Sequence, residues 1–162
     1  MAERWFLKLD GIAGESTDAA HPGEIDVQSW TWGVSNSGSP SGGGGGGGAG
    51  KASFEDFHFV TRISTASPPL FLACATGTHI KQANLIGSRD SAKGKATDFL
   101  KYRLHDVTVS SLGQTDSDAN PPGEHFSLNY AKVEVSYTPQ NPLGKMTAPV
   151  TAGFDLKANK KL

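Results

Sequence analysis

The sequence lacks the features that stabilise secreted or membrane-spanning proteins. Its 162 residues include one cysteine, Cys74, which excludes an intramolecular disulfide and is typical of folding in a reducing compartment. No apolar run approaches the roughly 20 residues of a transmembrane helix, so we expect no membrane insertion. Glu3, Lys8 and Asp10 interrupt the N-terminal apolar positions, so we expect no signal peptide and, for any export, a different route.

Excess charge of either sign is also missing. Fifteen Lys and Arg balance sixteen Asp and Glu, which leaves a formal net charge of −1. This balance gives no attraction to nucleic acid or to an anionic membrane. Only 36% of residues are hydrophobic and 19% charged, with 20 glycines. This composition favours a loop-rich β protein of one domain, spanning residues 1–162, over a helical bundle.

The N-terminal half shows the period of two that is typical of strands. Trp5, Leu7 and Leu9 share one face of the first strand, and Phe6 indicates that the other face is covered too. The next strand begins with Ile25 and Val27 and then changes face, which predicts a bulge or two buried faces near Gln28–Ser29. A third strand follows at Ala52–Val60, with aromatic residues on both faces.

A glycine-rich tract at residues 36–50 joins the second and third strands. It includes an unbroken run from Gly42 to Gly48 and, apart from Pro40, no apolar side chain larger than alanine. Such a segment has nothing to bury and great backbone freedom, so it predicts an extended loop carried by two anchored strands. Loops of this kind suit contact with a partner better than catalysis.

One short helix of about two to three turns is predicted between Ser64 and Gly77, beginning after Ser67. Ser67 stands at the expected N-cap, Pro68 and Pro69 lie in the first turn, and Gly77 stands at the C′ position. Cys74 lies among apolar residues of this segment and is interpreted as a small buried side chain.

Four strands are predicted after the helix, and a second loop of small polar residues at Leu112–Gly123 lies among them. Apolar positions change face within two of the strands. A strand that bends from one packing surface to another would produce this pattern, and so would an outer face buried against neighbouring subunits. The four ranges are His79–Arg89, Thr97–Ser110, His125–Thr138 and Val150–Lys157.

Residues typical of catalysis or cofactor binding form no convincing pattern. Gly45–Lys51 matches the start of a phosphate-binding loop, but Ala52 replaces the metal-binding hydroxyl and a strand follows where that motif needs a helix. The five histidines are scattered, without the short spacings of a zinc site. No nucleophile motif surrounds a serine or Cys74. We therefore expect a protein that is not an enzyme and that uses no cofactor or metal.

From Phe6 to Pro139 the chain resembles the Hcp (haemolysin-coregulated protein) family, the tube proteins of bacterial type VI secretion systems. The resemblance is strongest in the W-x-W-G-x-S element, the glycine-rich loop and the phenylalanine-rich strand that follow one another. The matching segments are FLKLDGIAGES (Phe6–Ser16), EIDVQSWTWGVSNSGS (Glu24–Ser39), GGGGGAGKASFEDFHFV (Gly44–Val60), PPLFLACATGTH (Pro68–His79), VTVSSL (Val107–Leu112) and FSLNYAKVEVSYTPQ (Phe126–Gln140).

The resemblance implies a mainly β fold, a small barrel of two sheets with one short helix at its side. It further implies a homo-hexameric ring, with rings stacked into a tube that is assembled in the bacterial cytoplasm and released outside the cell. A contractile sheath and a tip spike protein are the implied partners, and small effector proteins are the implied cargo of the lumen. The competing interpretations are a monomeric ligand-binding barrel or carrier and a small enzyme built around Lys51.

Two groups of residues are the candidate contact sites. The glycine-rich loop is expected to touch the next ring, and the second loop is expected to face the lumen or a neighbouring subunit. The ring-contact candidates are Ser39, Gly42, Gly45, Gly48, Gly50 and Lys51. The lumen or neighbour candidates are Ser111, Gln114, Thr115 and Asp116.

Overall fold

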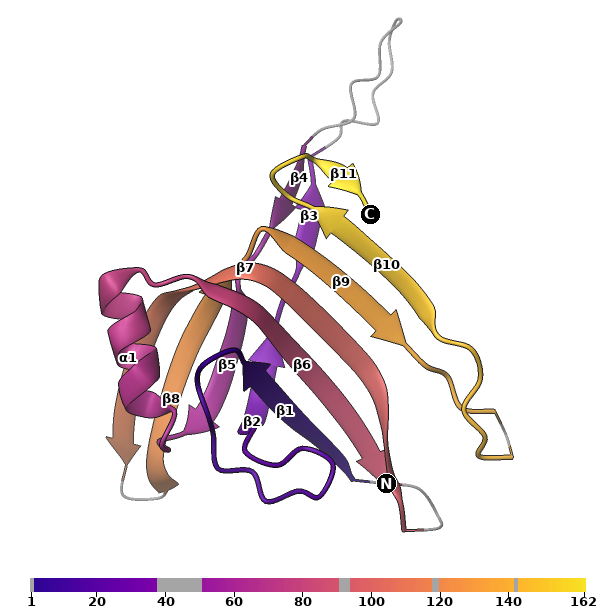
Figure 1. The fold of residues 1–162 in the computed structure, drawn as a ribbon, viewed down its shortest axis with the longest axis horizontal. Helices are drawn as coiled ribbons and strands as arrows, with labels where there is room; N and C mark the ends of the chain where they lie inside the picture. Colours follow the sequence, from indigo (N-terminus) through magenta and orange to yellow (C-terminus); the bar gives the residue numbers. More distant parts are fainter. Residues whose placement is uncertain (1, 38–50, 91–93, 118–119, 142) are drawn as a thin grey trace, which may run out of the picture.

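The computed structural model describes residues 2–37, 51–90, 94–117, 120–141 and 143–162. Within them the chain forms eleven strands and one helix (Figure 1). The strands are β1 (Glu3–Leu9), β2 (Ile25–Thr31), β3 (Val34–Asn36), β4 (Ala52–Phe54), β5 (Phe57–Arg62), β6 (Ile80–Asp90), β7 (Ala96–Ser117), β8 (Asn120–Asn129), β9 (Lys132–Tyr137), β10 (Val150–Asp155) and β11 (Lys160–Lys161), and the helix is α1 (Ser67–Thr76).

Six strands close into a barrel, which confirms the predicted fold class. The large sheet runs in the order β11-β10-β9-β7-β6-β1-β2-β5-β8, and an additional pairing of β7 with β8 closes the part from β7 to β8. Strands β9, β10 and β11 continue the sheet beyond β7, and we call them the extension (Figure 1). The strands β3 and β4 form a separate two-stranded hairpin, which we call the arm.

The apolar residues that change face within a strand are explained by a bend at matching positions. β7 pairs first with β9 and then with β8, and it bends at Asp106, whose φ of 54° lies in the left-handed region. β8 and β9 are separated at Tyr130–Ala131, where the Ala131 N–H donates to His105 O (2.9 Å). β7 and the consecutive strands β8 and β9 therefore exchange their apolar and polar faces at the same level, where the sheet passes from the barrel to the extension.

Two other expectations have different outcomes. The bulge in β2 is confirmed, because its register with β5 shifts between Val27 and Ser29. The prediction of a second loop at Leu112–Gly123 is wrong. Residues 112–117 continue β7 and residues 120–123 begin β8, and the two strands pair as a hairpin. Small polar residues are typical of loops, but here their backbones form hydrogen bonds between two adjacent strands of the barrel, β7 and β8.

The helix is confirmed, although its start is displaced by one residue. Ala66, not Ser67, holds the N-cap position, and the Ser67 hydroxyl instead donates to the buried Glu124 carboxylate (3.1 Å). Gly77 ends the helix with φ 66°, as predicted. Cys74 is a free, half-buried thiol and is thus more exposed than expected.

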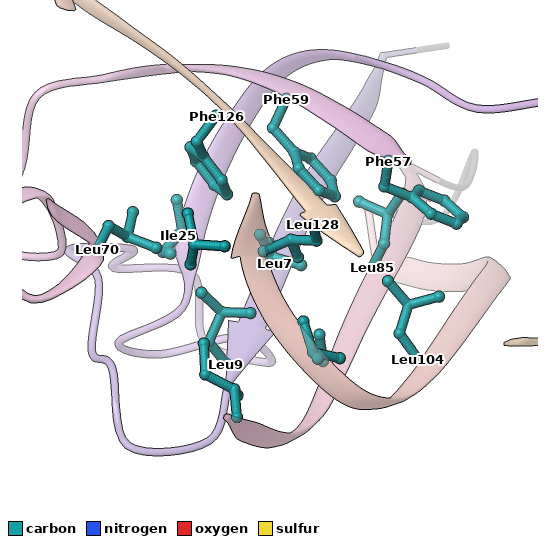
Figure 2. Packing of buried hydrophobic residues seen from close by; sticks show 14 of the residues in the cluster. Leu7, Leu9, Ile25, Phe57, Phe59, Leu70, Leu85, Leu104, Phe126 and Leu128 are labelled. Atoms are coloured by element: carbon teal, nitrogen blue, oxygen red, sulfur yellow. The ribbon is translucent and has the colours of Figure 1, made fainter. Parts of the chain in front are cut away.

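The barrel interior is filled by side chains from every wall strand and from α1. Figure 2 shows Phe57, Phe59 and Phe126 beside a layer of leucines that includes Leu7 and Leu128. These five side chains are at most 1% exposed. Such packing provides the main stabilisation of the fold, at about 25 cal/mol for each Å² of apolar surface buried.

Candidate functional site

The root of the arm is fixed to the barrel and to the extension by aromatic residues. Trp32, just before β3, stacks on Phe57 with ring centroids 5.1 Å apart, and its indole N–H donates to the Tyr130 hydroxyl. Tyr130 in turn donates to the carbonyl oxygen of Glu55 (2.8 Å). Burial raises the pKa of Tyr130 to about 12, which keeps the phenol protonated and able to donate. At the end of β4, Phe54 stacks on Phe154 of the extension at 5.1 Å.

A shallow apolar hollow of about 150 Å³ lies between the root of the arm and the extension. All of its lining side chains are apolar, and alternation along β9 and β10 places Val133, Val135, Ala152 and Phe154 on one face of the extension. The lining residues are Trp32, Phe54, Val133, Val135, Ala152, Gly153 and Phe154.

Exposed apolar residues continue this face beyond the hollow. Val150 precedes Ala152 on the same face of β10 and is 68% exposed, and its β9 partner Tyr137 is 44% exposed. Val34 on the arm is also exposed. A continuous apolar surface of this kind usually marks an interaction site. The other face of the extension is polar, with Thr151 of β10 paired to Ser136 of β9.

The second group of predicted contact residues lies on the β7–β8 hairpin rather than in a loop. The Ser111 hydroxyl bonds to Ser127 on the outward face of the barrel, and Thr115 pairs with Gly123 nearby. Gln114 points the other way, where its amide donates to Glu124 Oε2 (2.7 Å). Asp116 is exposed near the end of β7. The structure thus separates Gln114 from Ser111 and Thr115.

The outward face around Ser111 carries hydroxyl and imidazole groups beside the exposed side chain of Val60. Thr31, His58 and Ser127 lie in one cross-strand row of β2, β5 and β8, and Ser111 of β7 extends that row. The His125 ring lies over Gly113, at which a Cβ atom would come within 2.3 Å of His125 Nε2. Glycine at position 113 therefore allows this flat arrangement.

Most of the predicted ring-contact residues lie outside the described residues. This holds for Ser39, Gly42, Gly45, Gly48 and Gly50, and the candidate loop remains a prediction. Lys51 is described and exposed, and the strand β4 begins directly after it at Ala52. A strand at this position counts against the phosphate-binding interpretation, since that motif opens a helix.

The described residues contain neither a metal-binding cluster nor a membrane-spanning helix. Among them, no group of three or more His, Cys, Asp and Glu side chains could hold a metal ion. In the same part of the chain no helix has the length and apolarity required to cross a membrane.

Comparison with known proteins agrees with this geometry. Residues 6–137 match the family described as "Type VI secretion system effector, Hcp". Protein hcp1 of Pseudomonas aeruginosa is 39% identical over 161 residues, which cover 98% of each chain. The crystal structure of Hcp1 from Salmonella typhimurium is 34% identical, covers both chains fully and superposes with a TM-score of 0.78. A structure titled as a type six secretion system protein reaches a TM-score of 0.91 at 28% identity, with 99% of this chain and all of the other covered.

A six-stranded barrel with a sheet extension, an arm and one helix is thus the fold that this chain shares with proteins of type VI secretion. The chain belongs to the Hcp family.

Proposed function

We propose that this chain is a tube subunit that assembles into rings of six, that the rings stack, and that effector proteins travel in the lumen. In this proposal a contractile sheath propels the tube, a spike protein caps it, and the tube leaves the bacterial cell. Family membership and the unpartnered apolar face of the extension support it. The single observation that carries it is this apolar face, because a monomer gains nothing from exposing it.

The occupant proposed for the hollow is a second copy of the chain. A ring requires a heterologous contact, in which one patch of a subunit meets a different patch of the next. The hollow, with Val150 and Tyr137 beside it, provides one patch on the extension. The strands β9 and β10 of the extension lie on the side of the molecule opposite α1 (Figure 1). Contacts on opposite sides of a subunit are what a closed ring needs.

The arm is proposed to reach the adjacent ring. It projects from the body of the molecule, while Trp32 and Phe54 hold its root (Figure 1). The outward face with Thr31, His58 and Ser111 is proposed as the lumen wall, because uncharged hydroxyl groups do not hold a passing protein tightly. The filled barrel interior counts against a monomeric ligand-binding barrel.

Solution mass and shape test the proposal directly. Light scattering of the purified full chain is expected to give six times the subunit mass, and negative-stain images are expected to show annular particles. A monomer that persists at high concentration would overturn the ring.

Deletion of Gly42–Gly48 should leave the rings intact and weaken their stacking. We expect weaker stacking because, in this proposal, the loop contacts the adjacent ring and makes no contact within its own ring. Electron microscopy of tubes formed at high concentration would measure their length distribution. Replacement of the same residues by seven alternating Gly and Ser residues controls for loop length. Tubes as long as those of the unmodified chain would contradict the assignment.

A further inference from the structure

The connection between β1 and β2 is an ordered segment, which we call the clasp (residues 11–24). Its backbone forms a small ladder of its own: Gly14 N–H donates to Gly23 O (2.8 Å), Gly23 N–H to Ser16 O (2.8 Å) and Ser16 N–H to Glu24 O (2.9 Å). Asp18 accepts hydrogen bonds from the backbone N–H groups of Ala20 (2.9 Å) and His21 (3.2 Å). These bonds fix the position from which the His21 side chain leaves the clasp.

His21 is buried between two carboxylates. Its Nδ1 lies 2.6 Å from Glu24 Oε2, and its Nε2 lies 2.8 Å from Asp98 Oδ1 on β7. The residue is 5% exposed, and its ring stacks on Phe6 at 4.5 Å between centroids. Phe6 lies on the outward side of β1 and is fully buried, so the clasp provides its cover.

The geometry requires a particular protonation state. A neutral imidazole has one N–H donor and one nitrogen lone pair, whereas imidazolium donates from both nitrogens. With a carboxylate oxygen against each nitrogen, a neutral ring would direct its lone pair at a negative oxygen. Only imidazolium satisfies both contacts.

No other charged group described near the clasp could make its attachment depend on pH in the way that His21 does. Arg4 on β1 also packs over Phe6, with its guanidinium carbon 5.1 Å from the Phe6 ring centroid. Arg4 also pairs with Asp18 of the clasp at 2.9 Å. This pair is the second attachment of the clasp to β1, but Arg4 is exposed and stays charged at every relevant pH. Any pH-dependent part of the attachment therefore depends on His21 with Glu24 and Asp98.

We propose that the clasp is a proton-operated latch, in which the imidazolium of His21 bridges Glu24 and Asp98 and holds residues 11–24 over Phe6. Loss of the proton releases the clasp from β7 and uncovers Phe6. The inference concerns the subunit itself and goes beyond the proposed function, because it requires neither a ring nor a cargo.

The direction of the pH dependence follows from linkage. Burial by itself lowers the pKa of His21, but hydrogen bonds and charges from Asp98 and Glu24 outweigh it and raise the pKa above the ordinary 6.5. A raised pKa in the closed state means that the latch stabilises fully below pH 6.5 and is lost as the pH rises through the raised value. Opening should increase about tenfold for each unit by which the closed-state pKa exceeds the open-state pKa.

Hydrogen exchange of the full chain, followed by mass spectrometry at about pH 6 and about pH 9, tests the latch. After correction for the intrinsic pH dependence of exchange, amides of residues 11–24 should be less protected at the higher pH, by the factor that the measured His21 pKa shift sets. His21→Gln keeps a polar side chain but cannot carry charge. In this variant the amides of the clasp should be equally protected at both pH values, and their protection should match that of the unmodified chain at high pH.

Two further measurements complete the test. His58→Gln, an exposed histidine on β5, is the matched control and should leave the pH response of the clasp unchanged. In an NMR titration of the unmodified chain, the His21 ring should titrate above the ordinary pKa of 6.5. Equal protection of the clasp at both pH values, or a His21 midpoint at or below pH 6.5, would overturn the proposal even if His21→Gln failed to fold.

Discussion

Phe57→Ala is expected to lower the free energy of unfolding by about 3–5 kcal/mol. Phe57 is fully buried and its ring packs against five other aromatic rings. Its ring stacks on Trp32 (5.1 Å) and lies edge-on to Tyr102 (5.3 Å) and Tyr130 (5.6 Å). Removal of the ring leaves a cavity that the surrounding rigid aromatics cannot fill, and it loosens the root of the arm.

Urea denaturation followed by tryptophan fluorescence measures this loss. Several protein concentrations are needed, because subunit association adds to apparent stability by mass action. Phe71→Ala is the matched control: Phe71 lies on α1, is 61% exposed and should change stability by no more than about 0.5 kcal/mol. A loss of less than about 1 kcal/mol for Phe57→Ala would show that the core repacks around the missing ring.

If the proposed ring forms, Val150→Glu is expected to convert it into folded monomers. Val150 is 68% exposed, so a carboxylate there costs the isolated subunit little. In a ring that covers the apolar face of the extension, the same carboxylate would be buried without a partner, which costs several kcal/mol for each contact. With six contacts in each ring, light scattering should report the subunit mass, while circular dichroism remains unchanged.

Thr151→Glu provides the control at the next position of the same strand. Thr151 is exposed like Val150, but it points to the opposite, polar face of β10. The hexamer should therefore survive this substitution. If Thr151→Glu broke the ring and Val150→Glu did not, the interface would lie on the polar face, and the assignment of the hollow would be wrong.

Local patterns predicted the parts of the fold that depend on local chemistry. Gly77 ends α1 with positive φ because only glycine adopts that conformation without strain, and the sequence shows that glycine directly. The bulge near Ser29 was visible because apolar residues changed face within one strand. The N-cap was misplaced because Ser67 bonds to Glu124, a residue 57 positions away, instead of to its own helix.

The parts that depend on distant pairing were not predictable from local pattern. The strand character of residues 112–117 and 120–123 comes from hydrogen bonds between β7 and β8, whereas their small side chains are typical of loops. The sequence allowed two explanations for apolar residues that change face, and the bend at Asp106 shows the first of them. The hollow combines β4, β9 and β10 with Trp32, and no spacing in the sequence brings these together.

The His21 site was missed for the same reason. The sequence contains His21 and Glu24 three positions apart, which is a weak signal within a loop. Asp98, the second partner, lies 77 positions away. Only the pairing of β1 with β6 and of β6 with β7 brings it to the clasp.

The strand β7 has a mechanical consequence for the subunit. Along one edge β7 is bonded to β6, and along the other it is bonded first to β9 and then to β8. A force directed along the strands of the extension is therefore carried into the barrel wall by shear on the hydrogen bonds along both edges of β7, which are loaded together. A flexible linker at this place would instead stretch before it transmitted load. Pulling on the extension should thus unfold extension and barrel in one step, and a thrust against the extension should move the subunit as one rigid piece.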